Sequence, residues 1–181
     1  MGNIRRSRGY SYEYLIVKRL NTRQWIAKRL GGSSVGLPDI VAVNNYKGIL
    51  LAIEAKSGTG DALYVPSDQI QRCFSIIKMF RYYSNKHVIL AFKFLRKKRI
   101  RRKNATIYES RKLVEYYKVV DILGGKKKIP QIKCNYIGET FVVSENLTKK
   151  IKFPEFKMPF QTNIRIINNN VEIDQKNDNT G

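Results

Sequence analysis

The sequence predicts a mixed α/β protein in which helices flank one β-sheet, and three observations predict it. Three short apolar runs with strand character lie between Trp25 and Lys56, and a stretch with helical spacing begins at Ser67. A further apolar run covers residues 88–94, and a helical segment precedes all of these runs. The element order is therefore αβββαβ, and the last strand, reached through a helix, should pair in parallel within a mixed sheet.

The first helix is predicted from about residue 5 to residue 20, because four apolar residues fall on one helical face there: Tyr10, Tyr14, Val17 and Leu20. The other face is basic. Residues 25–30 are predicted to form a strand. Residues 39–43 and 49–56 are predicted to form a hairpin, because the turn-forming sequence NNYKG separates them.

The second helix is predicted over residues 67–82, with Ser67 as its N-cap. Its buried side should carry a stripe of five residues, namely Ile70, Cys73, Phe74, Ile77 and Phe80. The last core strand follows at residues 88–94, and His87 begins it.

Residues 1–99 are predicted to form the core, and residues 100–174 a small α+β extension of unknown role. Within the extension, residues 108–120 have helical spacing through Leu113, Tyr116, Tyr117 and Val120. Residues 139–144, 163–167 and 171–174 alternate like strands. Residues 175–181 are expected to be a disordered tail.

The charge of the chain indicates a polyanionic partner. The 181 residues carry a formal net charge of +21, with a pI near 10.1. Residues 1–29 contain eight bases and a single acid, Glu13, while residues 81–128 contain sixteen bases and three acids. Such one-sided blocks favour phosphate binding over a merely solvated surface, so nucleic acid is the leading partner.

Other classes of function are disfavoured by what the sequence lacks. It has no apolar run of transmembrane length and no signal-peptide pattern, so we expect a cytoplasmic protein without a membrane partner. The two cysteines, Cys73 and Cys134, are expected to be reduced thiols. The sequence GGSSVG lacks the Lys and Ser/Thr that end a phosphate-binding P-loop, so no nucleotide cofactor is expected.

The hairpin carries a charged triplet, Asp39, Glu54 and Lys56. Side chains alternate along a strand, so Glu54 and Lys56 point to the same face. Charged groups ending an apolar strand are costly to bury without a partner, and Mg²⁺ held by the two carboxylates would supply one. The carbonyl of Ala55 offers a third oxygen ligand. Lys56 would orient a water molecule or stabilise developing charge, which suits phosphodiester cleavage.

The surrounding motifs strengthen this interpretation. They are, in order, RRSRGYSYEYLIVKRL, WIAKRLGGSSVGLPDIVAV, ILLAIEAKSG, ALYVPSDQIQRCFSIIKMF and HVILAFKF. Together they resemble the archaeal Holliday junction resolvases, members of the PD-(D/E)xK nuclease superfamily, over about residues 4–98. No counterpart is recognised after about Ile100. The resemblance implies a restriction-endonuclease-like fold, with residues 1–99 as the nuclease core.

The resemblance also implies an activity. The protein would be a Mg²⁺-dependent homodimeric endonuclease of archaeal type that resolves four-way DNA junctions in recombination and repair. Its catalytic residues would be Glu13, Ser33, Asp39, Glu54 and Lys56. The metal ligands would be Glu13, Asp39, Glu54 and Ala55. The DNA-binding residues would be Arg5, Arg6, Arg8, Arg29, Ser34, Arg96, Lys97 and Lys98.

Alternatives remain open at this stage. The active-site serine is Ser33 or Ser34, with Ser33 at the better spacing from Arg29. A restriction-like or flap-type nuclease would use the same site. A noncatalytic DNA-binding protein would keep the fold and the charge, although it would have no reason to keep carboxylates beside a phosphate backbone.

Overall fold

The structure is a computed structural model, and it describes residues 4–30, 36–102, 105–144 and 147–161, without the side chains of residues 4–9 and 102. Its centre is a five-stranded sheet in the order β1-β2-β3-β5-β8. The bounds of these strands are β1 Ile26–Arg29, β2 Ile40–Asn44, β3 Ile49–Gly58, β5 Asn85–Phe94 and β8 Val114–Val119. Only β3 and β5 pair in parallel, so the sheet is mixed, as predicted.

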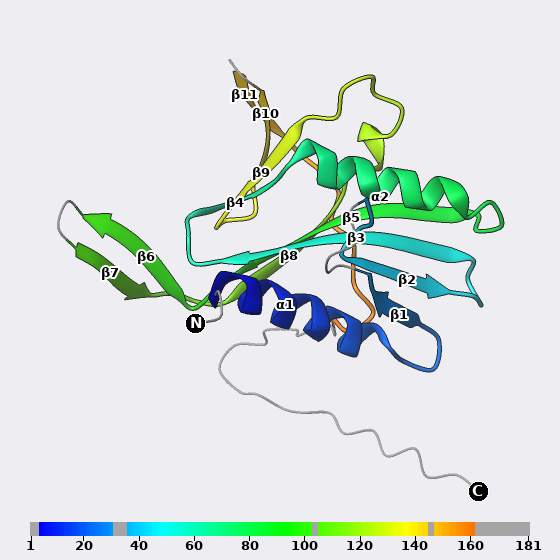
Figure 1. The fold of residues 1–181 in the computed structure, drawn as a ribbon, viewed down its shortest axis with the longest axis horizontal. Coiled ribbons are helices and arrows are strands. Elements are labelled where there is room, and N and C mark those ends of the chain that lie inside the picture. Colours follow the sequence, from blue (N-terminus) through cyan, green and yellow to red (C-terminus); the bar gives the residue numbers. More distant parts are fainter. Residues whose placement is uncertain (1–3, 31–35, 103–104, 145–146, 162–181) are drawn as a thin grey trace, which may run out of the picture.

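Two helices cover the two faces of this sheet (Figure 1): α1, Ile4–Leu20, and α2, Ser67–Met79. The side chains of β3 divide between two hydrophobic clusters. Leu51, Ile53 and Ala55 pack on the α1 side, while Ala52 packs on the α2 side. The alternation of faces along β3 is confirmed. The predicted αβββαβ order is confirmed for the elements of the central sheet and its two helices, but an additional strand, β4 Ala62–Val65, lies between β3 and α2 and belongs to another sheet.

The remaining strands form two smaller sheets. A four-stranded sheet in the order β11-β10-β9-β4 lies on the α2 side, and a two-stranded hairpin projects beyond the end of the central sheet (Figure 1). The small sheet consists of β4 Ala62–Val65, β9 Gln131–Asn135, β10 Thr140–Ser144 and β11 Leu147–Ile151. The hairpin consists of β6 Lys97–Arg102 and β7 Ala105–Ser110.

The predicted buried face of the first helix is confirmed for Leu20, which is fully buried, and for Val17, which packs against the cluster on the α1 side, but it is wrong for Tyr10 and Tyr14. Tyr10 and Tyr14 are exposed, and the residues that face the sheet are Tyr12, Ile16 and Leu20. This helix has two overlapping apolar stripes, the predicted one and the one that faces the sheet, because apolar residues recur at helical spacing on both sides of it. The stripe that packs on the sheet is the one that contains Ile16, which is fully buried.

The helix predicted over residues 108–120 does not form. Residues 105–110 are β7, and residues 114–119 are β8, which pairs antiparallel with β5. Tyr116 packs on the α2 side of the sheet and Tyr117 on the α1 side. A strand that is buried on both faces has consecutive apolar residues, and this pattern imitates helical spacing over a short window.

The second helix ends three residues earlier than predicted, at Met79. Ile70, Cys73 and Phe74 are buried, but Phe80 lies beyond the helix and is partly exposed. Ser67 is the first helical residue, and the N-cap is Pro66, without a side-chain cap hydrogen bond. The prediction that Ser67 caps the helix is therefore wrong.

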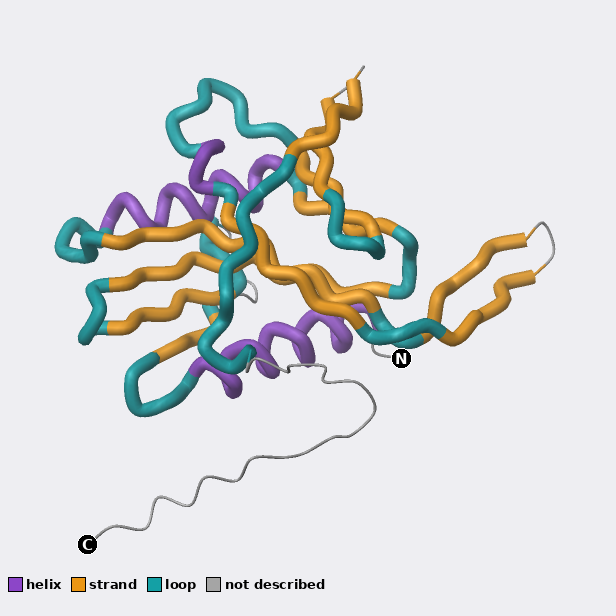
Figure 2. The backbone as a smooth tube through the Cα atoms, turned by 180° about the vertical axis from the view of Figure 1, so that it is seen from behind, coloured by secondary structure: helices purple, strands orange, loops and turns teal. Residues whose placement is uncertain are grey.

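The predicted extension shares the core with the residues before it. Strand β8 completes the central sheet, and residues 152–161 cross from the α2 side to the α1 side (Figure 2). This segment also covers the free edge of β8, since Phe156 N–H donates to the Tyr117 carbonyl at 2.8 Å. The strand predicted at residues 139–144 is confirmed as β10. Residues 163–167, 171–174 and 175–181 lie outside the described residues.

Both cysteines are free and buried, as predicted. None of the helices that the structure describes is long and apolar enough to cross a membrane.

The place of β8 in the core leads to a first prediction. Tyr117→Ala should lower the free energy of unfolding by about 3–5 kcal/mol, because it empties a site that is 1% exposed. The matched change Tyr108→Ala, on the exposed hairpin strand β7, should cost less than about 0.5 kcal/mol. Urea unfolding of the two variants measures the difference, and equal costs would contradict the assignment of β8 to the core.

Candidate functional site

The register of β2 against β3 places two carboxylates opposite each other. Ile40 pairs with Ile53, so Asp39, the residue before β2, falls across from Glu54. Two backbone hydrogen bonds fix Asp39 there: Ala55 N–H donates to its Oδ2 at 2.9 Å, and Leu30 N–H donates to its carbonyl oxygen at 2.8 Å. Residues facing each other across antiparallel strands project from the same face, so the two side chains converge.

Glu54 is the more buried carboxylate, with 2% of the residue exposed. Its Oε1 accepts a hydrogen bond from Lys56 Nζ at 2.6 Å, two residues along the same strand. The ammonium of Lys56 is therefore held beside the carboxylate, while about a quarter of the Lys56 side chain stays accessible. The prediction that Glu54 and Lys56 share one face of the strand is confirmed.

The electrostatics of this pair are unusual. The pKa of Glu54 is raised to about 7: burial raises it most, the ammonium of Lys56 opposes the shift, and the charge on Asp39 adds to it. The single cation of Lys56 therefore does not offset the cost of ionising two adjacent carboxylates in a buried place. A further positive charge beside Glu54 would favour its ionised form.

Glu13 reaches the edge of this site from α1. Its Oε2 accepts a hydrogen bond from Arg29 Nε at 2.5 Å. Burial raises the pKa of Glu13, Asp39 raises it further, and Arg29 lowers it. The guanidinium of Arg29 also lies 4.4 Å from the centre of the Tyr10 ring. Glu13 and Arg29 therefore form a second charged group next to the carboxylates.

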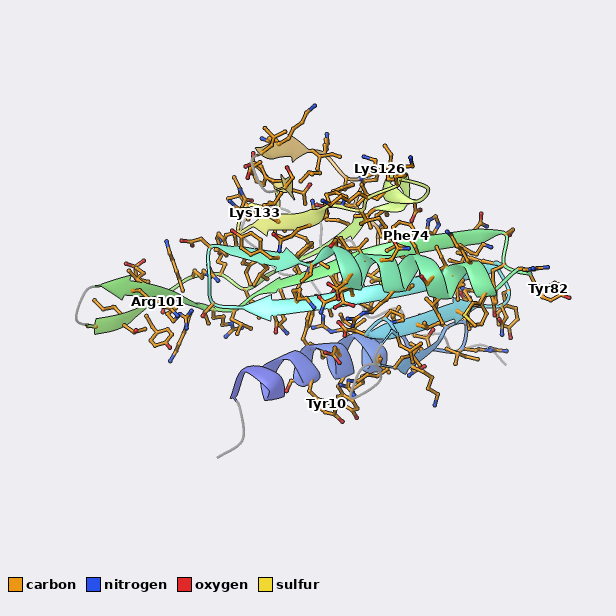
Figure 3. All side chains as sticks on the ribbon, turned by 45° about the horizontal axis from the view of Figure 1, so that its top comes forward. Tyr10, Phe74, Tyr82, Arg101, Lys126 and Lys133 are labelled. Carbon is orange, nitrogen blue, oxygen red and sulfur yellow. The ribbon has the colours of Figure 1, made fainter. Side chains whose placement is uncertain are left out.

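Two features of the site were missed by sequence reasoning. Tyr10, placed on the buried face of the first helix, instead stacks with Arg29 on the outer side of α1 (Figure 3). Cys73, expected only as an apolar residue of α2, lies close enough for the charges of Glu54 and Asp39 to contribute to the raised pKa of its thiol. The helical spacing of Cys73 with Ile70 and Phe74 predicts that it is buried, but no local pattern predicts that it lies near Glu54.

The site offers two carboxylates as metal ligands. Among the residues that the structure describes, no three side chains of His, Cys, Asp or Glu gather closely enough to hold a metal ion. Asp39 and Glu54 supply the hard oxygen atoms that Mg²⁺ prefers, and their excess negative charge fits a divalent cation. Glu13 is engaged by Arg29 instead of completing a cluster of three.

The other predicted site residues lie apart or outside the described part of the chain. Ser33 and Ser34 are outside the described residues. Arg5, Arg6 and Arg8 belong to the first turns of α1, and their side chains are likewise not described. Arg96, Lys97 and Lys98 begin the projecting hairpin, and Lys98 pairs with Asp61 at 3.1 Å.

Comparison with known proteins places the chain in a class of nucleases. The sequence profile of the archaeal Holliday junction resolvases (Hjc) matches residues 4–130. The chain belongs to this family, so it is a Holliday junction-resolving nuclease that binds branched DNA. Nucleases of this family generally use a divalent metal ion. The match also reaches past the predicted limit of the resemblance, residue 98, and takes in β8.

The solved structures that are similar to this chain include that of Archaeoglobus fulgidus Hjc, a Holliday junction resolvase from an archaeal hyperthermophile, at 22% sequence identity. The alignment covers 71% of this chain and 89% of that one, with a TM-score of 0.47. No curated protein sequence matches the chain.

The raised pKa of Glu54 gives a prediction of pH dependence. In metal-free buffer the wild type should lose stability as the pH rises from about 4.5 through 7, because ionisation of Glu54 is disfavoured in the folded state. Glu54→Gln has no such ionisation. Between pH 4.5 and pH 8 its free energy of unfolding relative to the wild type should therefore rise, by a few kcal/mol at most. Urea unfolding at the two pH values measures the shift.

The exposed carboxyl of Asp68 on α2 provides a matched control. Asp68→Asn should follow the wild type at both pH values. If Glu54→Gln also follows the wild type, the burial of an ionisable carboxyl at this position is not what governs stability.

Proposed function

We propose that the protein is a Mg²⁺-dependent endonuclease that cuts four-way DNA junctions by phosphodiester hydrolysis, in recombination and repair. The observation that carries this proposal is the buried carboxylate of Glu54, held opposite Asp39 and beside the ammonium of Lys56. This arrangement provides both a hard-metal site and a cation for the phosphate in one place.

Asp39, Glu54 and the main-chain carbonyl of Ala55 are the proposed ligands of Mg²⁺. The ion supplies Lewis-acid stabilisation of the phosphate charge and acidifies a bound water molecule. Asp39 is prepared for this role because Ala55 N–H fixes the orientation of its carboxylate. The raised pKa of Glu54 supports the same role, since a divalent cation would favour its ionised form.

Lys56 is the proposed catalytic cation. Its Nζ is held at 2.6 Å from Glu54 and remains partly accessible, so it can orient a water molecule or stabilise charge that develops on the phosphate. Glu13 is proposed as the third acidic group of the site, oriented by Arg29. Ser33 is proposed to act on the substrate phosphate, with Ser34 as the alternative.

Basic residues outside the carboxylate pair are proposed to bind the DNA backbone. Arg29 lies at the edge of the site, and Arg5, Arg6 and Arg8 belong to the first turns of α1. Backbone contacts of this kind carry no sequence information, which suits an enzyme that selects DNA by shape.

Removing one carboxylate should abolish cleavage without abolishing binding. We expect Asp39→Asn to slow cleavage of a four-way junction in Mg²⁺ by at least about a hundredfold, because it weakens the metal site. Junction affinity in metal-free buffer should stay close to that of the wild type. Asp68→Asn, the same chemical change on the exposed side of α2, should leave the cleavage rate unchanged.

The choice of substrates makes this experiment informative about the kind of nuclease. Junction, flap, linear duplex and single-stranded DNA are compared under the same conditions. Preference for a flap or for linear duplex would replace the junction proposal by the corresponding nuclease class. Absence of cleavage on every substrate, with binding retained, would leave only a DNA-binding protein.

We also propose that the active species is a homodimer, because symmetric cutting of a four-way junction needs two active sites. Light scattering should give a mass of about twice the 21.1 kDa of one chain. Mixed dimers of wild type and Asp39→Asn should nick one strand of the junction without cutting the opposing strand. A monomeric mass both with and without junction DNA would contradict the dimer.

A further inference from the structure

The β6–β7 hairpin has two chemically different faces. Cross-strand pairs share a face, so Lys97, Arg99 and Arg101 lie together with their partners Ser110, Tyr108 and Thr106. The other face carries Lys98 opposite Glu109 and Ile100 opposite Ile107. All three bases of the first face lack an acidic neighbour across the hairpin, and the one acid of the hairpin belongs to the second face.

The second face is the one turned toward the rest of the protein. Lys98 pairs with Asp61, in the turn between β3 and β4, at 3.1 Å. Within the described residues Lys97, Arg99 and Arg101 have no ion pair with any other part of the chain. Figure 3 shows Arg101 on the projecting hairpin, beyond the end of the central sheet and away from Tyr82 at the other end. Three cations therefore lie on a face of the hairpin that makes no ion pair with the other described residues.

The base of the hairpin is fixed firmly to the strand that carries the active site. Leu95 N–H donates to the carbonyl of Gly58, the last residue of β3, and Arg99 N–H donates to the carbonyl of Thr59, the next residue, each at 2.9 Å. Arg111, whose side chain is 8% exposed, donates to the carbonyls of Leu95 and Gly60 at 2.9 and 3.0 Å. Its guanidinium also stacks on Tyr136 at 4.6 Å. The ribbon is thus held in a set direction relative to Lys56.

The dimensions of the cationic face suit duplex DNA. Residues on one face of a strand recur about every 6.6 Å, so Lys97, Arg99 and Arg101 span about 13 Å. Duplex DNA carries about one negative charge per 1.7 Å of its axis, so several phosphates lie within that span. The hydroxyl of Tyr108, which lies opposite Arg99, is a further donor of the kind found at phosphates.

We propose that this face of the β6–β7 ribbon, formed by Lys97, Arg99, Arg101 and Tyr108, binds the phosphate backbone of a duplex arm away from the cleaved bond. The inference rests on the proposed action on branched DNA and adds a second contact site to it. It also revises the predicted set of DNA-binding residues: Lys97 stays in the set, Arg99 and Arg101 join it, and Lys98 becomes a structural residue through Asp61.

The test compares two triple variants with equal loss of charge. Lys97→Gln/Arg99→Gln/Arg101→Gln removes the ribbon cations. The control, Lys47→Gln/Lys149→Gln/Lys152→Gln, removes three exposed lysines outside the two basic segments. Affinity for a labelled linear duplex and for a four-way junction is measured across a range of salt concentrations in metal-free buffer.

The ribbon variant should bind both DNAs about ten- to a hundredfold more weakly at low salt. The slope of log K against log salt should fall in magnitude by about 2–3, because each phosphate that the protein no longer neutralises lowers it by about 0.9. The control should keep most of the wild-type slope. A third variant, Lys97→Arg/Arg99→Lys/Arg101→Lys, should restore binding, which shows that charge and not local folding is responsible.

Unchanged binding by the ribbon variant, or an equal loss in the control, would overturn the inference. A single-turnover cleavage rate at saturating protein that falls as far as that of Asp39→Asn would place the ribbon at the scissile phosphate instead. If the wild type cleaves no DNA, only the proposed nuclease activity is contradicted. The inference about the ribbon is still tested, because the binding comparison needs neither metal nor cleavage.

Discussion

The antiparallel register between β2 and β3 is the constraint on which the site depends. It sets Asp39 across from Glu54, and the buried position of Glu54 then forces two like charges into a small volume. A shift of one residue would turn Glu54 to the opposite face of the sheet. The parallel pairing of β3 with β5 holds β3 from the other side, and Cys73 of α2 lies close enough to Glu54 for its charge to act on the thiol.

The structure separates its charged residues by task. Acidic groups gather at the end of the β2–β3 hairpin, where Lys56 opposes Glu54 and Arg29 opposes Glu13, while Asp39 accepts from the backbone N–H of Ala55. Bases without such partners stand on the projecting ribbon. Paired charges in partly buried places fix geometry, whereas unpaired exposed charges attract a polyanion over longer distances. A chain with a net charge of +21 can therefore still hold a compact acidic centre.

Sequence alone predicts the elements in which side chains alternate or recur with a clear period. The hairpin, the shared face of Glu54 and Lys56 and the parallel last strand all follow from spacing. Spacing fails where one segment is apolar on two sides: Tyr116 and Tyr117 imitate a helix, and α1 offers two stripes of which the sheet accepts only that of Ile16. The partners of Glu13 and Lys98 depend on contacts between distant segments, which no local pattern encodes.

The crossing of residues 152–161 ties the two sides of the sheet together. Phe153 belongs to the hydrophobic cluster around α2, and Met158, five residues later, belongs to the cluster around α1. If either cluster loosens, one end of this segment is released, and the edge of β8 that the segment covers becomes exposed. The two clusters should consequently melt as one cooperative unit, and the sheet that carries the carboxylate pair should melt with them.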